Sequence, residues 1–411
     1  MNLDPERLPE ACDVLVVGAG PAGSATAATL AAGGVDVVLV DQHAFPRDKV
    51  CGDALIPDAH QALRRLGVLD EVLAQARAVT HVGCIGPRGG RIDVPGTLAV
   101  LPRRQLDDIV CRAAVARGAR MYAPLRFVGI VEEQGIVCGA TLARGGRQFD
   151  LRARWVVLAS GAVPQALMAA GVCERQAPSG VALRGYVRHT AMATRQRHLD
   201  VVWHRALRPG YGWIFPCRDG IFNIGVGVSD SHDPRRRGGP ARRDTNLRTL
   251  FDAFAQVYAP ARELLDGGES LGPLKGAPLR CSLEGARWSR PGLIATGEAA
   301  GSTYSFTGEG IGKALETGLL AANALLQARR DGLGDAAVRA GYEAALRALK
   351  PRFDLYERAN RINEHPWLAD LLIWRAQRSP RLLRRMSGVL EETSNPGNLL
   401  TPRGLWRLFG E

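Results

Sequence analysis

Three glycines near the N-terminus have the spacing of a phosphate-binding turn. Gly18, Gly20 and Gly23 follow an apolar stretch and open an alanine-rich one in the pattern G-x-G-x-x-G, with Ala22 inside it. In such a turn the first glycine permits a tight bend, the second lets backbone approach a pyrophosphate, and the third lets a helix pack on a strand. The helix N-terminus stabilises the anion. The pattern predicts that this turn binds the pyrophosphate of a dinucleotide.

An acidic residue stands where a dinucleotide site needs one. Asp41 ends the next apolar stretch and is followed by Gln42, which we also place at the site. A carboxylate at this position accepts hydrogen bonds from the ribose hydroxyls of adenosine. Since NAD and FAD share the adenosine half, these residues leave both cofactors open.

A second glycine-rich stretch indicates which dinucleotide is bound. Residues 295–301 read A-T-G-E-A-A-G, and residues 307–311 read T-G-E-G-I. They resemble the G-D-A-A-G…G-x-G-I segment of flavoproteins, in which the acid contacts the ribityl chain and the following amides face the pyrimidine end of the flavin. The resemblance implies FAD as the cofactor, with Glu298 in place of the usual aspartate. It also places at the cofactor Gly308, Gly310 and Ile311.

Two shorter matches lie between these segments. Residues 103–107 read R-R-Q-L-D and resemble the R-x-x-x-D helix start whose arginine touches the flavin nucleotide. Arg103 is therefore a candidate and Arg104 the fallback, against the alternative of a surface arginine at a helix start. Residues 156–161 resemble the strand that ends in A-D-G in flavin hydroxylases, but Ser160 replaces that aspartate.

The most discriminating segment is residues 45–54, which read F-P-R-D-K-V-C-G-D-A. It resembles the F-P-R-x-K-x-C-G loop of the geranylgeranyl reductase family. Residues 182–186, 211–216 and 223–227 continue this resemblance, which covers roughly residues 10–325 and extends to bacterial menaquinone reductases. The resemblance places near the flavin the loop residues Arg47, Cys51, Gly52 and Ala54.

Members of this family reduce carbon–carbon double bonds of polyprenyl chains. Flavin N5 delivers the hydride, and a protein or water acid supplies the proton. Such a reaction needs a long apolar slot beside the flavin. The residues that we expect to line it are Tyr186, Tyr211, Trp213, Phe215 and Tyr304.

The resemblance makes Cys51 the first candidate catalytic residue, because the C-G loop of the family runs past the flavin ring. Its thiol would donate the proton or only shape the pocket, and the alternative is a packed, inert thiol. Tyr211 is the second candidate and Tyr304 a further possible donor, although buried tyrosines are commonly walls with a satisfied hydroxyl.

Three other functions compete with a reductase. An FAD-dependent monooxygenase acting on an aromatic or polyketide-like compound would share the fold, but Ser160 breaks its A-D-G motif. A flavin halogenase would need a W-x-W-x-I-P motif and a lysine between Lys49 and Lys275, and the sequence has neither. A non-catalytic, flavin-carrying binding protein would leave the C-G loop and the aromatic slot without a purpose.

The elements that must position these residues follow from hydrophobic periodicity. A strand at 13–18, a helix at 21–32 and a strand at 35–41 form a βαβ unit. Later segments predict helices at 59–75 and 103–116, a β-meander from 126 to 152, a strand at 155–159, aromatic strands between 179 and 274 with a polar insertion at 233–244, and helices from 311 onwards.

We therefore expect an α/β protein with a Rossmann-type FAD-binding domain, an inserted mixed β-sheet substrate domain and a helical C-terminal region, as in p-hydroxybenzoate hydroxylase. The FAD-binding domain would comprise residues 1–78, 102–177 and 276–330, the substrate domain residues 79–101 and 178–275, and the helical region residues 331–411.

Composition limits the partners. The chain has 411 residues and a net charge of +12, which would attract phosphates, nucleic acid or an anionic membrane, but no nucleic-acid-binding motif accompanies the charge. Eight cysteines without C-x-x-C spacing argue against zinc and a disulfide framework, and we expect no metal. No apolar run could span a bilayer and no signal peptide is evident, so we expect a cytoplasmic protein.

The C-terminal helices suggest a membrane contact. Trp367, Leu368, Leu371, Leu372 and Trp374 share one side of a helix, and five arginines follow, namely Arg375, Arg378, Arg381, Arg384 and Arg385. Such a segment suits a peripheral helix at the inner face of the membrane, and the alternative is packing on the enzyme body.

The sequence leaves open the substrate, and also the external reductant, which would be NAD(P)H or a ferredoxin-like electron-donor protein.

Overall fold

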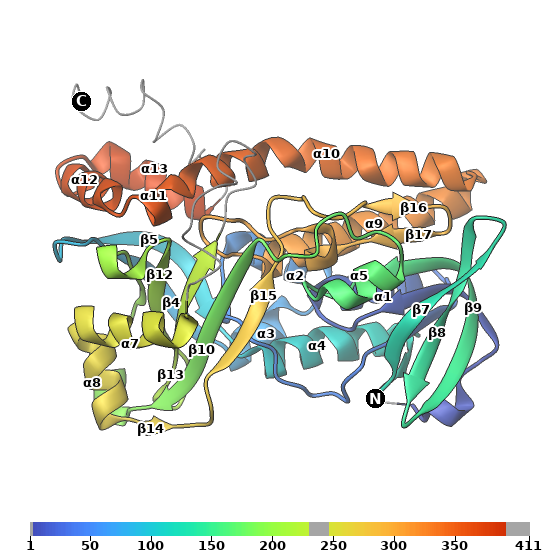
Figure 1. The fold of residues 1–411 in the computed structure, drawn as a ribbon, viewed down its shortest axis with the longest axis horizontal. Helices are drawn as coiled ribbons and strands as arrows, with labels where there is room; N and C mark the ends of the chain where they lie inside the picture. The colour runs from blue at the N-terminus through green and yellow to red at the C-terminus, as the bar shows by residue number, and fades with distance from the viewer. Residues whose placement is uncertain (1–2, 230–245, 392–411) are drawn as a thin grey trace.

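Two β-sheets with helices packed on them form the described part of the chain, residues 3–229 and 246–391 of the computed structural model (Figure 1). The polar insertion expected at 233–244 lies outside the described residues. The structure confirms the predicted fold class, because a Rossmann-type unit, a second mixed sheet and a helical C-terminal region are all present.

The first sheet carries the predicted βαβ unit. Its strand order is β16-β17-β9-β1-β2-β6, with β7 and β8 attached through β9. Strand β1 pairs in parallel with β2 and β9. Residues 14–17 of β1, all of β2 and residues 155–158 of β9 are continuous apolar runs, because both faces of the sheet are covered there. The strands are β1 Ala11–Val17, β2 Val37–Val40, β6 Arg120–Tyr122, β7 Arg126–Glu133, β8 Ile136–Arg144, β9 Arg147–Leu158, β16 Ser289–Arg290 and β17 Leu293–Ala295. The end of the predicted β-meander and the strand predicted at 155–159 form one strand, β9.

Small residues let two helices approach each other closely beside this sheet. A Cβ atom on Gly318 of α9 (Ile311–Asp331) would lie 2.3 Å from the carbonyl oxygen of Ala22 in α1 (Pro21–Ala32). The other helices of this half are α2 Pro57–Arg65, α3 Leu69–Gln75, α4 Arg103–Ala116 and α5 Pro164–Ala169. The single helix predicted at 59–75 is two helices, because Gly67 adopts a φ of 66° after α2.

The second sheet has the order β14-β10-β13-β12-β11-β4-β5-β3, and β15 also pairs with β10. Its strands are β3 Ala54–Leu55, β4 Arg77–Ile85, β5 Arg91–Val100, β10 Gly180–Arg188, β11 Leu199–Val202, β12 Gly210–Pro216, β13 Ile221–Ser229, β14 Glu269–Ser270 and β15 Lys275–Leu279. Helices α6 Thr190–Ala193, α7 Leu247–Val257 and α8 Ala259–Gly267 accompany it. Strands β3 and β15 fall in segments that the sequence assigned to the FAD-binding domain, because such short strands show little alternation of polar and apolar residues.

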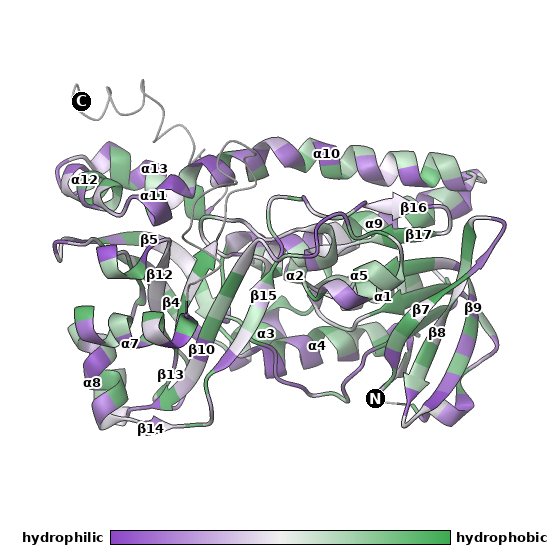
Figure 2. Ribbon diagram, in the orientation of Figure 1, coloured by the Kyte–Doolittle hydropathy of each residue, from purple (hydrophilic) through white to green (hydrophobic). Residues whose placement is uncertain are grey.

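The C-terminal helices run along one side of the molecule, at the top of Figure 1. They are α10 Asp335–Ala359, α11 Arg361–Glu364, α12 Trp367–Ala376 and α13 Pro380–Leu390. Figure 2 shows hydrophobic and hydrophilic residues alternating along α10, as expected for a helix with one face on the protein. None of the helices in the described ranges is long and apolar enough to cross a membrane.

Candidate active site

Each glycine of the N-terminal turn meets a different steric demand. Gly18 has a φ of 102°, and a Cβ atom there would lie 2.3 Å from the carbonyl oxygen of Ala159. A Cβ atom on Gly23 would lie 1.8 Å from the carbonyl oxygen of Gly18. A Cβ atom on Gly20 would instead have two guanidinium nitrogens as its nearest neighbours, at 3.6 and 3.8 Å. The turn therefore leaves bare backbone beside positive charge, which suits a pyrophosphate.

Those two guanidinium groups belong to Arg47 and Arg103, and the buried carboxylate of Asp107 holds both. Arg47 Nη1 lies 3.0 Å from Asp107 Oδ2, and Arg103 Nε donates to Asp107 Oδ1 over 2.6 Å. Burial alone would lower the pKa of Arg103, but the Asp107 carboxylate outweighs burial and raises it. Arg103 thus stays charged beside Gly20, and Arg47 pairs with the same carboxylate.

The carboxylate of Asp41 lies at the same turn. Its Oδ2 accepts a 2.9 Å hydrogen bond from the Ala19 amide, and Arg47 Nε lies 3.5 Å from its Oδ1. Gln42, the next residue, is exposed. Asp41 Oδ1 also accepts a 2.9 Å hydrogen bond from the His43 amide. Asp41 is thus held at the turn where the adenosine ribose of a dinucleotide is expected, and its Oδ2 keeps a lone pair for a ribose hydroxyl.

The acidic turn of the second flavoprotein segment packs directly on the glycine turn. A Cβ atom on Gly297, whose φ is 64°, would lie 2.5 Å from the Cβ of Ala22. Glu298 Oε1 accepts a 3.2 Å hydrogen bond from Thr303 Oγ1. Gly308 has a φ of 66°, and Gly310 caps the N-terminus of α9, which Ile311 begins. The fold therefore joins the two nucleotide signatures into one site.

Two consecutive residues of the C-G loop tie it to opposite sheets. Arg47 pairs with Asp107 on the FAD-binding side, as described above. Asp48 accepts from Arg184 Nη2 at 2.5 Å and from Lys275 Nζ at 2.8 Å, and both donors belong to the second sheet. Burial works to raise the pKa of Asp48, but Lys275 and Arg184 lower it overall. The loop is therefore clamped at the junction of the two sheets.

The thiol of Cys51 lies within this junction. Its Sγ accepts a 3.4 Å hydrogen bond from the Asp53 amide, and its carbonyl oxygen accepts a 2.7 Å bond from Asn223 Nδ2. Burial raises the pKa of Cys51 even though the nearby Arg103 charge opposes that rise. The thiol is accordingly protonated at neutral pH and retains a proton that it could donate.

Aromatic side chains of β12 form a ladder between the loops that the sequence assigned to the flavin. The ring centroids of Tyr211 and Trp213 are 6.2 Å apart, and those of Trp213 and Phe215 are 6.3 Å apart. At one end, a Cβ atom on Gly52 would lie 3.0 Å from the Phe215 ring. At the other end, the Tyr211 hydroxyl donates to the carbonyl oxygen of Thr307 over 2.6 Å. The ladder thus spans the distance from the C-G loop to the T-G-E-G loop.

Neighbouring glycines explain how the central indole of the ladder is placed. A Cβ atom on Gly225 would lie 2.3 Å from Trp213 Cζ2, whereas one on Gly227 would lie 3.5 Å from Cζ3. Trp213 Nε1 also donates to Asn223 Oδ1 over 2.9 Å. The N-I-G-V-G sequence of β13 therefore provides a flat seat and one polar anchor for the indole ring.

Comparison with known proteins agrees with this geometry. Residues 11–263 match the FAD binding domain family. The menaquinone reductase of Mycolicibacterium smegmatis is 33% identical over 332 residues, which are 75% of each chain. The chain belongs to the geranylgeranyl reductase family of FAD-dependent oxidoreductases.

One further relative and one solved structure are also similar to this chain. The digeranylgeranylglycerophospholipid reductase of Methanosarcina mazei is 28% identical, over 77% of this chain and 75% of that protein. The solved structure of a geranylgeranyl bacteriochlorophyll reductase-like protein from Thermoplasma acidophilum has a TM-score of 0.72 and 22% identity, and the match covers 98% of this chain and 96% of that one. This second likeness concerns the fold alone.

FAD is the cofactor of this family member, and the residues present fit it. The turn at Gly20 offers backbone beside two arginines, and Asp41 lies at its edge. Ser160 Oγ, next to Gly18, is buried and has no hydrogen-bond partner among the described residues, so a polar group of the cofactor could satisfy it. Direct contact of each predicted residue with FAD stays a prediction.

Sequence reasoning missed two residues that hold the site together, Asp53 and Asn223. Asp53 has a φ of 68° and no solvent exposure, and its Oδ2 accepts from the Tyr186 hydroxyl at 2.5 Å and from Asn223 Nδ2 at 2.7 Å. Burial raises the pKa of Asp53 to about 6, although these two hydrogen bonds oppose the rise. The available signal was an acid next to the C-G pair and an asparagine in an otherwise apolar strand.

One predicted pocket residue lies elsewhere. Tyr304 is 1% exposed, and its ring stacks on Tyr356 of α10 at a centroid distance of 3.8 Å and contacts Phe353 at 4.7 Å. A ring enclosed by other aromatic rings is part of a core and does not line an open slot. The expectation that Tyr304 forms a pocket wall is therefore wrong in this structure.

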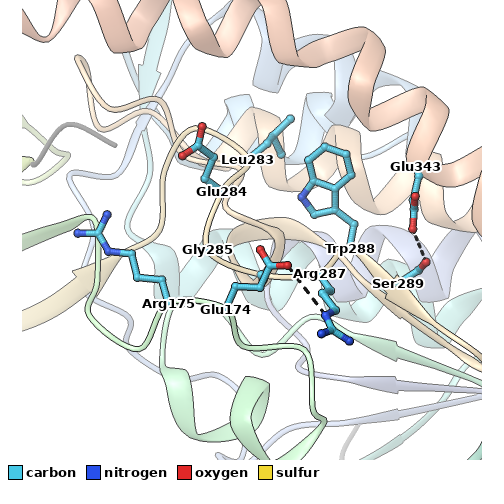
Figure 3. A pocket seen from close by; sticks show the side chains of 10 residues that line it. Glu174, Arg175, Leu283, Glu284, Gly285, Arg287, Trp288, Ser289 and Glu343 are labelled. Atoms are coloured by element: carbon cyan, nitrogen blue, oxygen red, sulfur yellow. Dashed lines mark hydrogen bonds and ion pairs between the residues drawn. The ribbon is translucent and has the colours of Figure 1, made fainter. Parts of the chain in front are cut away.

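A cavity of about 570 Å³ lies at the surface beside the loop 283–289 (Figure 3). Charged side chains such as Glu174, Arg287 and Glu343 dominate its lining, and Glu343 accepts a 2.6 Å hydrogen bond from Ser289 Oγ. No residue of the aromatic ladder or the C-G loop lines it. We therefore do not assign the apolar substrate to this cavity.

Proposed function

We propose that this protein reduces carbon–carbon double bonds of an isoprenoid or prenyl-type substrate. The observation that carries the proposal is the aromatic ladder of β12, which joins the two loops expected at the flavin. The relatives named menaquinone reductase and digeranylgeranylglycerophospholipid reductase support it, since both names denote molecules with polyprenyl chains.

The protein's first task would be to hold FAD between its two signatures. The bare backbone at Gly20, the paired arginines and Asp41 would bind the adenosine diphosphate half, and Glu298 with the N-terminus of α9 would hold the flavin half. When bound, FAD in its reduced form supplies a hydride equivalent from N5. The C-G loop, which its ion pairs hold to both sheets, would keep the flavin ring at one place beside the aromatic ladder.

The second task would be to align an apolar chain. Tyr211, Trp213 and Phe215 present a row of rings whose polar hydrogens are both engaged, that of the Tyr211 hydroxyl with Thr307 and that of Trp213 Nε1 with Asn223. A prenyl chain packed on such a row gains dispersion and loses contact with water. Both effects would favour a chain of double bonds over a polar substrate.

The third task would be to supply a proton to the carbon that does not receive the hydride. Cys51 carries a neutral thiol on the C-G loop, and burial keeps it protonated. Burial likewise raises the pKa of Tyr211, but its proton already binds the Thr307 carbonyl oxygen. Cys51 is therefore the better candidate for the donor. One hydride and one proton together account for the two hydrogens added to the double bond.

The proposal is tested by reducing the purified flavoprotein with dithionite without oxygen and mixing it with a geranylgeranyl lipid or a polyprenyl quinone. Flavin reoxidation with a mass gain of two hydrogens in the lipid supports a prenyl reductase. Oxygen insertion into a phenol, in a parallel mixture with oxygen, would instead identify a monooxygenase. Binding of either compound without any flavin reoxidation would identify a flavin-carrying binding protein. Dithionite makes the test independent of the natural reductant.

A further inference from the structure

Two tryptophans lie exposed on one face of α12. Trp367 is 61% exposed and Trp374 is 46% exposed. They are seven positions apart, which is about two helical turns, so they lie on the same side of the helix. Leu371, between them, is half-buried. Large apolar side chains grouped on a surface indicate a contact with a partner or a membrane.

The orientation of this face is fixed by the opposite side of the helix. Leu368, Leu372 and Ile373 are buried in a cluster that includes Trp203 and residues of β5. Asp370 Oδ1 also accepts a 3.1 Å hydrogen bond from the amide of Arg88 in the β4–β5 turn. Packing of α12 on the rest of the protein, which the sequence left as an alternative, therefore explains why Leu368 and Leu372 are apolar. It does not explain the two exposed tryptophans.

One arginine packs on an exposed tryptophan, and two more are exposed on the next helix. The guanidinium carbon of Arg378 lies 4.9 Å from the Trp374 ring centroid, and Arg378 Nη1 donates to the Trp374 carbonyl oxygen. Arg381 and Arg384 are exposed on α13. None of these three arginines forms an ion pair with another described residue, so their charge is available to an anionic partner.

The same helix lies at the outer end of the aromatic ladder. Its buried leucines share a cluster with Trp203, which stacks on Phe306 at 6.1 Å and lies 6.3 Å from Tyr211. A continuous series of aromatic rings thus leads from beneath α12 to the C-G loop. Figure 1 shows α12 and α13 above β5 at the end of the molecule that holds the second sheet.

We propose that the face formed by Trp367, Leu371, Trp374, Arg378, Arg381 and Arg384, here called the docking face, binds the surface of an anionic phospholipid bilayer. Tryptophan rings partition into the headgroup region, and arginines bind lipid phosphates. Its role in passing an apolar substrate to the ladder rests on the proposed function. The binding itself needs only the docking face.

The test is co-flotation of the full-length flavoprotein with vesicles of phosphatidylcholine containing phosphatidylglycerol, and with vesicles of phosphatidylcholine alone. Wild type is expected to bind the anionic vesicles and to bind less as salt rises. Replacing Arg378, Arg381 or Arg384 by glutamine should weaken this binding about fivefold for each arginine. The double variant Trp367→Ala/Trp374→Ala should bind less at every salt concentration, and bound FAD should report an intact fold.

Matched controls lie on β7 to β9 at the opposite end of the molecule in Figure 1. Ile136 is 50% exposed, and Arg126 and Arg154 are exposed. Ile136→Ala and Arg126→Gln/Arg154→Gln should leave vesicle binding unchanged. Equal binding by wild type and the tryptophan variant would overturn the proposal, as would a change in oligomeric state without vesicle binding. Flotation uses no prenyl substrate, so its failure and the failure of the proposed reaction are separate results.

Discussion

The hydroxyl group of Tyr186 donates a 2.5 Å hydrogen bond to Asp53, a carboxylate with no solvent exposure. Tyr186 belongs to β10 of the second sheet, and Asp53 follows the C-G loop. Asn223 and the amide of Arg103 donate to the same carboxylate at 2.7 and 3.2 Å. One buried acid thus links the FAD-binding half to the substrate half.

Removing the hydroxyl from this pair should weaken the junction. Tyr186→Phe leaves a buried carboxylate with one donor fewer, and we expect the free energy of unfolding to fall by about 1–3 kcal/mol. Urea unfolding at neutral pH measures the change. Tyr122→Phe is the matched control, since its hydroxyl donates a longer, 3.2 Å bond to the Arg7 carbonyl oxygen and not to a carboxylate. An equal loss in the two variants would contradict a special role for Asp53.

The pKa of Asp53 predicts a pH dependence of stability. Burial raises the pKa to about 6 in the folded protein, from 3.8 for an unperturbed aspartate. The folded state then binds this proton more tightly than the unfolded state, so stability falls as pH rises from about 4 to about 6, by up to about 3 kcal/mol.

Asp53→Asn should remove that slope, because an amide does not titrate and asparagine tolerates the φ of 68°. Urea unfolding between pH 4.5 and 7 compares it with wild type. The control Asp150→Asn changes an exposed aspartate and should keep the wild-type slope. If Asp53→Asn retains the slope, another group is responsible for it.

The second glycine of the turn should be essential for the cofactor and dispensable for folding. Gly20→Val places a branched side chain beside Arg47 and Arg103, where the pyrophosphate is expected. The purified variant should lose FAD, measured as flavin absorbance per protein, while its circular dichroism is unchanged. Gly129→Val, in open space on β7, is the control and should keep FAD. A fully flavinylated Gly20→Val protein would exclude this turn as the pyrophosphate site.

The thiol of Cys51 should affect turnover more than cofactor binding. Cys51→Ser keeps the size of the side chain but replaces the thiol with a far weaker acid, so we expect FAD to remain and the rate constant of flavin reoxidation by substrate to fall about a hundredfold. Single-turnover reoxidation by the prenyl substrate is the measurement. Cys138→Ser, on β8, should behave as wild type. Unchanged turnover in Cys51→Ser would show that the thiol is not the proton donor.

Two glycines of β13 offer a graded test of the aromatic ladder. Gly225→Ala puts a Cβ atom 2.3 Å from the Trp213 ring and 2.6 Å from the Leu183 carbonyl oxygen, so it must displace the indole and shift the neighbouring strand β10. Gly227→Ala adds ordinary contact at 3.5 Å. We expect Gly225→Ala to raise KM for the prenyl substrate about tenfold or more and to shift tryptophan fluorescence. Gly227→Ala should change neither. Equal KM values in both variants would show that Trp213 does not form part of the substrate-binding surface.

The sequence by itself determined the local elements and the chemistry of the turns. The predicted bounds of α1 and α4, Pro21–Ala32 and Arg103–Ala116, are those of the structure. Glycine spacing and Asp41 sufficed to predict a dinucleotide, because a turn with positive φ and a close backbone approach depend on neighbours in the chain. The family resemblance, carried by residues 45–54, is likewise local.

Only the tertiary structure decided which distant residues meet. Periodicity shows that a side chain is buried, but its partner depends on how sheets and helices dock. Tyr304 was therefore placed in the slot although it stacks on Tyr356, and the bond between Asp53 and Tyr186 was not foreseen. The same holds for α12, where docking on β5 buries the leucines and leaves Trp367 and Trp374 exposed. Long-range contacts are properties of the packed core, and a single sequence carries no direct record of them.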